Sequence, residues 1–159
     1  MSNIIALIWD FDKTLVDGYM QDPLFAEYGI DNKEFWKEVN ALPEKYEEEQ
    51  GVRVNRDSIY LNHILSYVKS RKFSGLNNKK LECLGGDINF YPGVLDIFPK
   101  TIDIIKKNGT YKEFNIKVEH YIVSTGLTQM IWGSPMMEYG AVILLNPLIL
   151  KRRKKSFLK

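Results

Sequence analysis

The sequence predicts an α/β fold in which a small parallel sheet packs against helices. Two predicted strands favour this fold, an apolar run at 4–9 near the start and a segment at 118–123 that ends in the apolar residues Tyr121-Ile122-Val123. Runs of this length that are rich in β-branched residues are typical of strands buried in a parallel sheet. The long segment between them repeats apolar residues at helical spacing, which indicates helices rather than further strands.

The first predicted strand ends in two carboxylates one residue apart, Asp10 and Asp12. Side chains at i and i+2 of a strand point to the same side, so we expect the pair to emerge together. Open α/β sheets bind ligands at the carboxyl ends of their strands, and neighbouring carboxylates repel unless a cation or a shared proton relieves them. Mg²⁺ prefers such oxygen ligands. The alternative is that both residues cap the turn after the strand.

The segment 19–88 is expected to be entirely helical, after a turn-rich loop at 16–23. Asp31 is a predicted N-cap, because Glu34 follows three residues later as in a capping box. Pro43 is expected to interrupt this helix.

Two further helices are predicted before residue 88. One begins at Asp57-Ser58 and repeats apolar residues at helical spacing. The next follows Asn77 and ends at Gly85-Gly86. The whole of 19–88 is then an insertion between the first strand and the remaining core.

The second half of the core begins with a helix whose apolar face starts at Val94. Lys106, Lys107 and Gly109 are typical of a helix end. A polar connection is expected over 110–117, before the strand that ends at Ser124.

The strand at 118–123 delivers Ser124, Thr125 and Gly126 to a short predicted helix at 127–131. A hydroxyl group and backbone N–H groups at a helix start favour an anion such as phosphate. The alternative is that Ser124 serves only as the N-cap of that helix.

Two segments carry a resemblance to a known family. Asp10-Phe11-Asp12-Lys13-Thr14-Leu15 resembles the first signature of the haloacid dehalogenase-like (HAD) hydrolase superfamily in its phosphatase form, and 121–126 resembles the second. The resemblance extends from about residue 4 to residue 134. It implies a partial Rossmann-like parallel sheet formed by 1–18 and 89–150, with 19–88 inserted as a helical cap.

The resemblance also implies a reaction, the hydrolysis of a small phosphomonoester. Asp10 would be the nucleophile and Asp12 the general acid and base, and Mg²⁺ would be held by the Asp10 carboxylate and the Asp12 backbone carbonyl. Thr14 would steady the loop. Ser124, with Thr125 and Gly126, would contact the substrate phosphate.

Two later signatures of the family, a lysine and a further acidic pair, have no clear counterpart. The sole acidic residue after Ser124 is Glu138, and Lys151, Lys154 and Lys155 match the lysine by type alone. We therefore expect the chain to be the N-terminal portion of a longer hydrolase, with its sequence disrupted near 132–139. The alternative is a truncated, catalytically inactive remnant of such an enzyme.

The amino-acid composition restricts the expected binding partners and the expected cellular location. The chain has 22 basic and 20 acidic residues, but six of the basic residues lie in the tail at 151–159, so the remainder carries 16 against 20 and a net charge of −4. An acidic body argues against nucleic-acid binding. No apolar run approaches the roughly 20 residues that span a bilayer, although the apolar run before the basic tail leaves a membrane-surface anchor as a weaker alternative. A single cysteine, Cys83, is typical of a reducing cytoplasm.

Overall fold

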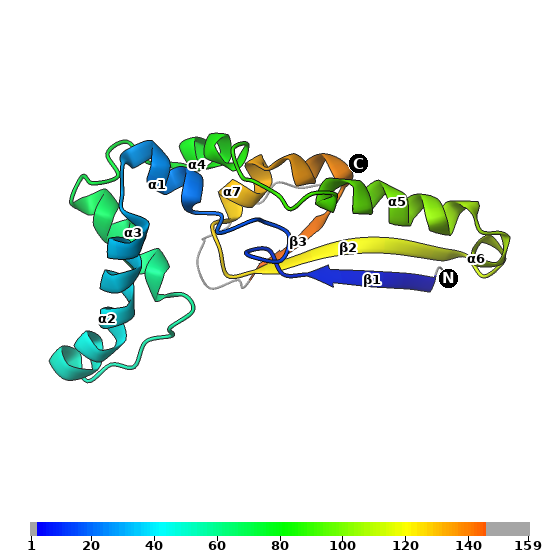
Figure 1. The fold of residues 1–159 in the computed structure, drawn as a ribbon. Helices are drawn as coiled ribbons and strands as arrows, with labels where there is room; N and C mark the ends of the chain where they lie inside the picture. Colours follow the sequence, from blue (N-terminus) through cyan, green and yellow to red (C-terminus); the bar gives the residue numbers. More distant parts are fainter. Residues whose placement is uncertain (1–2, 146–159) are drawn as a thin grey trace.

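The computed structural model describes residues 3–145 and has the predicted α/β class (Figure 1). Three parallel strands form the sheet in the order β1-β2-β3: β1 (Asn3–Trp9), β2 (Ile116–Ser124) and β3 (Val142–Leu145). The helices are α1 (Asp22–Tyr28), α2 (Asn32–Gln50), α3 (Ile59–Lys69), α4 (Asn78–Gly85), α5 (Val94–Lys107), α6 (Gly109–Glu113), α7 (Thr128–Gly133) and the 3₁₀ helix η1 (Pro135–Tyr139). The predicted basic tail at 151–159, with 146–150 before it, lies outside the described residues.

Both predicted strands are present, and β2 begins two residues earlier than the apolar run indicated. The strands β1 and β2 are neighbours although more than one hundred residues separate them, as Asn3 pairs with Ile116 and Trp9 with Ile122. Parallel neighbours need a crossover connection, and all the helices from α1 to α6 lie within it.

Helix α5 covers one face of the sheet through an aromatic cluster. Phe98 is fully buried, and its ring centroid lies 4.4 Å from that of His120 on β2 and 6.0 Å from that of Trp9 on β1. Trp9 Nε1 donates to His120 Nδ1 at 3.0 Å, so the neutral imidazole carries its proton on Nε2 and donates to Thr101 Oγ1 at 2.8 Å. Burial lowers the pKa of His120, which favours this neutral form.

The helices α1 to α4 extend the same apolar core away from the sheet (Figure 1). Phe35 of α2 is fully buried, and its ring lies 4.6 Å from that of Phe25 and 5.4 Å from that of Tyr67. Within the described chain, the predicted insertion at 19–88 contains helices and no strand. Burial of these rings, rather than helix propensity, stabilises the short helices.

Glycines join this helical segment to the core. Helix α4 packs directly on α7, where a Cβ atom at Gly133 would lie 1.7 Å from the carbonyl oxygen of Glu82. A Cβ atom at Gly85 would lie 2.2 Å from the carbonyl oxygen of Met130. The two backbones can approach this closely only because neither position carries a side chain.

Two local predictions were wrong. Helix α2 continues through Pro43 for its full 19 residues, because the missing N–H costs a single hydrogen bond while the proline ring is buried in the apolar core. Gly109 does not end α5 but begins α6, where a polar connection was expected, because the Asn108 side chain accepts hydrogen bonds from Thr110 N and Tyr111 N. Between residues 3 and 145 no helix is both long enough and apolar enough to cross a membrane.

Candidate functional site

The carboxyl ends of β1 and β2 bring together the two segments singled out in the sequence. Trp9, the last residue of β1, pairs with Ile122, which lies two residues before the end of β2 at Ser124. Asp10 and Ser124 therefore lie near the same ends of the two strands. Both loops therefore leave the same edge of the sheet. The structure thus brings the Asp10–Thr14 loop and the Ser124–Gly126 loop to one side of the molecule, as predicted.

The Asp10 carboxylate is exposed at the start of a tight turn. Thr14 Oγ1 donates to Asp10 Oδ2 at 3.2 Å, so a side-chain hydrogen bond joins the two ends of the turn. The turn is held by its backbone, because Leu15 N and Val16 N both donate to the Phe11 carbonyl oxygen. Asp10 therefore presents a carboxylate to solvent from a fixed backbone.

Asp12 lies deeper and has a different environment. Its Oδ1 accepts a hydrogen bond from Met20 N at 2.7 Å, which ties the far end of the loop to the carboxylate. Burial raises the pKa of Asp12 to about 6, and the charge of Asp10 adds to the rise while the Met20 hydrogen bond opposes it. The hydrogen bond from Met20 N agrees with the alternative that Asp12 caps the turn. The raised pKa also allows this carboxyl group to gain and lose a proton near neutral pH.

Ser124 does not cap a helix, so that alternative was wrong. Its Oγ accepts a hydrogen bond from Gly126 N at 3.0 Å, and α7 begins at Thr128 with Leu127 as its N-cap. The strand continues to Ser124 and the turn takes the next residues, so the helix starts one residue later than predicted. A hydroxyl oxygen that accepts one bond still has its own proton to donate to a ligand.

Met20 joins the two loops, and the sequence analysis missed it. Leu127 N donates to Met20 Sδ at 3.1 Å, and a Cβ atom at Gly126 would lie 2.1 Å from Met20 Cε. Met20 is fully buried between the Asp12 loop and the Ser124 loop. A side chain at Gly126 would therefore displace the end of the Met20 side chain.

Tyr60 of α3 also reaches the site, and it was likewise missed. Its hydroxyl donates to the Thr125 carbonyl oxygen at 3.3 Å. Burial, with a smaller contribution from the charge of Asp12, raises the pKa of Tyr60 well above its usual range. The Gln21 Oε1 atom is buried nearby and has no hydrogen-bond partner among the described residues. Neither Tyr60 nor Gln21 belongs to a local motif, so the sequence offered no signal for them.

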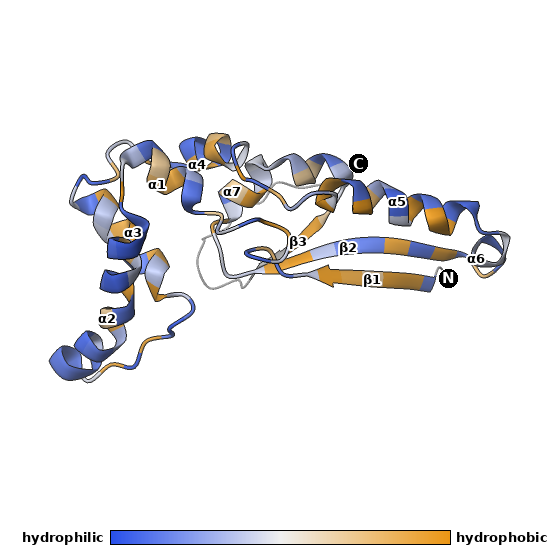
Figure 2. Cartoon of the chain, viewed as in Figure 1, coloured by the Kyte–Doolittle hydropathy of each residue, from blue (hydrophilic) through white to orange (hydrophobic). Residues whose placement is uncertain are grey.

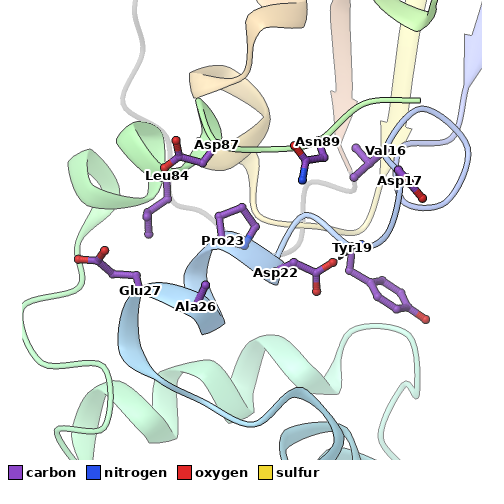
Figure 3. Close-up of a pocket in the computed structure, with 10 residues that line it drawn as sticks. All are labelled: Val16, Asp17, Tyr19, Asp22, Pro23, Ala26, Glu27, Leu84, Asp87 and Asn89. Carbon is purple, nitrogen blue, oxygen red and sulfur yellow. Dashed lines mark hydrogen bonds between the residues drawn. The ribbon is translucent and has the colours of Figure 1, made fainter. Parts of the chain in front are cut away.

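Two cavities flank this region. A cavity of about 790 Å³ lies between α3, α4 and the segment Ser124–Gln129, and every described residue that lines it is uncharged. A second cavity of about 520 Å³ is lined by four acidic residues (Figure 3): Asp17, Asp22, Glu27 and Asp87.

Two of the four carboxylates in the smaller cavity already have protein partners. Asp22 accepts from Tyr19 N and from the Asn32 amide, and Glu27 forms an ion pair with Lys80 at 2.5 Å. These contacts give Asp22 and Glu27 a structural role.

Asp10 and Asp12 fit a Mg²⁺ ion in part. Their charges interact, since the charge of Asp10 contributes to the raised pKa of Asp12, and a cation would relieve that repulsion. Within 3–145, however, no three acidic, histidine or cysteine side chains come close enough to form a metal site together. Mg²⁺ is commonly held by one or two carboxylates with waters and substrate phosphate, so the pair remains compatible with this ion.

Comparison with known proteins gives one relative and no family. No family model matches the chain. A protein of Borreliella burgdorferi (strain ATCC 35210 / DSM 4680 / CIP 102532 / B31), described as an uncharacterized protein, is 42% identical over 137 residues, which are 86% of this chain and 47% of that protein. The chain thus spans about half the length of the curated relative that it matches. This similarity assigns no chemistry, so the resemblance to HAD-like hydrolases stays a prediction.

Proposed function

We propose that the chain has the active-site half of a Mg²⁺-dependent phosphatase of the HAD-like type, which acts on a small phosphomonoester. One observation carries the proposal: an exposed carboxylate at the end of β1 lies two residues from a second carboxyl group, whose pKa is raised to about 6. Nucleophile and proton donor need these opposite environments, one accessible and ionised, the other buried and able to hold a proton.

The resemblance to HAD-like phosphatases implies the roles, and these environments support them. An oxygen of Asp10 attacks phosphorus and forms an aspartyl-phosphate, while the bond from phosphorus to the leaving alcohol breaks and protonated Asp12 donates its proton to the alcohol oxygen. Water then attacks the aspartyl-phosphate, Asp12 takes the proton of the water, and inorganic phosphate leaves Asp10. Thr14 holds the Asp10 carboxylate through the 3.2 Å hydrogen bond.

Two further features support phosphate chemistry at this edge. The Ser124 hydroxyl can donate to a phosphate oxygen, and Thr125 and Gly126 follow it in the same loop. The Asp10 carboxylate and the Asp12 backbone carbonyl would hold Mg²⁺, which neutralises phosphate charge when bound. The uncharged cavity beside Ser124 favours an ester whose alcohol part is neutral. A cytoplasmic location stays a prediction from the lone cysteine.

The second candidate is a remnant that binds phosphate or metal without turnover. The described residues bring no third carboxylate to Asp10 and Asp12. The nearest lysine in the sequence, Lys13, directs its ammonium group over the ring of Tyr19, at 4.2 Å from the centroid. Lys13 is therefore not directed at a phosphate in this structure, and the candidate lysines Lys151, Lys154 and Lys155 lie outside the described residues.

Thermal unfolding with and without Mg²⁺ and beryllium fluoride tests the proposal, because a ligand bound to the native state raises the midpoint. We expect a rise for the natural chain and none for Asp10→Asn, with Asp17→Asn, an exposed carboxylate of the same loop, as the matched control. If the natural chain hydrolyses p-nitrophenyl phosphate and Asp10→Asn does not, the result supports the active phosphatase over the inactive remnant. A midpoint rise without hydrolysis favours the remnant, and neither a rise nor hydrolysis refutes both.

A further inference from the structure

Within residues 3–145, one face of the sheet has no helical layer. Side chains alternate across a strand, and Trp9, His120 and Ile122 face α5. The opposite side chains form what we call the open face, which consists of Ile4, Ala6, Ile8, Lys117, Glu119, Tyr121, Val123 and Val142. The helices that run along the sheet in Figure 1 all lie on the α5 side, and Figure 2 shows β1 as hydrophobic along nearly its whole length.

The open face is in contact with solvent and is apolar toward the carboxyl ends of the strands, whereas the charged residues Lys117 and Glu119 lie beside Ile4 and Ala6. Ile8 is 68% exposed and Ile4 51%, and Val123 and Val142 are each 45% exposed. The parallel register places Ile8, Tyr121 and Val142 in one row across all three strands, so the apolar surface is continuous at this level of the sheet. Parallel sheets are normally covered on both faces, and a contiguous apolar surface of this kind marks an interface.

The edge of the sheet is open at the same place. Within residues 3–145, β1 pairs with β2 and with no other strand. An unpaired edge presents a row of N–H and C=O groups that can accept another strand. The surface to be covered therefore has two parts that meet along β1, a hydrogen-bonding edge and an apolar face.

The longer relative indicates what covers them. The 137 matched residues are 47% of the Borreliella protein, so that protein has more residues outside the match than within it. At 42% identity the matched part is expected to share this sheet, including its open face. A sheet face that residues 3–145 leave uncovered is expected to be buried by further polypeptide if the domain is to have a complete core.

We infer that the open face and the free edge of β1 bind a polypeptide equivalent to the unmatched part of that relative. This polypeptide adds a strand beside β1 and packs apolar side chains against Ile4, Ile8 and Val123. A second copy of the chain is the competing occupant, but it would offer β1 only the same strand and the same uncovered face. The inference does not depend on the proposed phosphatase chemistry.

Co-expression tests the inference. The full chain is produced together with the segment of the Borreliella protein that lies outside the match, each with its own affinity tag, and the product is analysed by size-exclusion chromatography with light scattering. We expect a one-to-one complex in which the backbone amides of β1 exchange with deuterium at least about tenfold more slowly than in the chain alone.

Matched variants locate the contact. Ile8→Lys is expected to weaken the complex by about 30-fold or more, because it introduces a charge into the centre of the covered face. Val52→Lys, at a residue 47% exposed in the loop after α2, is expected to leave affinity unchanged. Since Ile8 is largely exposed in the chain alone, the unfolding midpoint of Ile8→Lys should remain that of the natural chain.

Three outcomes would overturn the inference. The first is the absence of a complex. This means that the two proteins are both soluble and do not associate, or that the Borreliella segment precipitates and the chain stays in solution without it. The second is a complex that Ile8→Lys does not weaken. The third is a homodimer of the chain that Ile8→Lys disrupts, which would identify a second copy as the occupant.

Discussion

Replacement of Asp12 by asparagine should stabilise the chain above pH 6 and have no such effect at pH 4. Asparagine keeps the shape of the side chain and an oxygen that can accept from Met20 N, but it carries no charge. Asp12 is partly buried and its charge lies beside that of Asp10, so the ionised form destabilises the native state.

The pKa of Asp12 sets the magnitude and the sign. It rises from 3.8 to about 6 on folding, and each unit is worth about 1.4 kcal/mol, so the full effect is about 3 kcal/mol. Below pH 3.8 both the folded and unfolded states are protonated, and Asp12 has no effect on the pH dependence. Between pH 3.8 and 6 the unfolded state loses the proton first, so stability falls as pH rises, and above pH 6 the loss is complete.

Urea unfolding at pH 4, 5, 6 and 7.5 in EDTA measures this effect. The free energy of unfolding of Asp12→Asn relative to the natural chain should increase by up to about 3 kcal/mol from pH 4 to pH 7.5. Comparing pH values cancels any pH-independent effect of the amide. A difference that is the same at all four pH values would refute the reasoning. If Mg²⁺ binds at Asp10 and Asp12, saturating Mg²⁺ should reduce the difference at pH 7.5.

Two packing predictions follow, both measured by urea unfolding. Gly133→Ala should lower the free energy of unfolding by at least about 2 kcal/mol, since the new Cβ atom would lie 1.7 Å from the Glu82 carbonyl oxygen, whereas Gly109→Ala, with nothing within 4 Å, should change it by less than about 1 kcal/mol. Phe98→Ala should cost about 3–5 kcal/mol because the ring is fully buried, and its neighbour Ile97→Ala, at 37% exposure, should cost clearly less. Equal losses within either pair would contradict the packing described here.

The sequence predicted the parts of the fold that repeat locally. Strands were recognisable as short apolar runs, and helix starts at Asp31 and Asn77 were recognisable because each side chain caps the backbone N–H three residues later. Helix α6 was missed although Asn108 caps it in a similar way, because Gly109 was interpreted as the end of the preceding helix. Pro43 was misjudged because its burial depends on neighbours distant in the sequence.

Some residues of the candidate site could be predicted from the sequence and others could not, for the same reason. Asp10, Asp12 and Ser124 could be placed together from topology alone, because parallel strands deliver their carboxyl ends to one edge. Met20 and Tyr60 could not, because their roles arise when a loop and a helix fold back over that edge. The raised pKa of Asp12 belongs to this second group, since burial causes most of it.

The candidate site and the proposed interface share one strand, and this has a thermodynamic consequence. Strand β1 carries the exposed Asp10 at its end and the exposed Ile8 just before it. A polypeptide that covers β1 would remove water from around Asp10, and the repulsion between Asp10 and Asp12 would become stronger in the less polar surroundings. A bound Mg²⁺ ion would then relieve a larger repulsion than it does in the uncovered chain. Because coupling between two binding events is reciprocal, Mg²⁺ should also strengthen the binding of the covering polypeptide by the same factor.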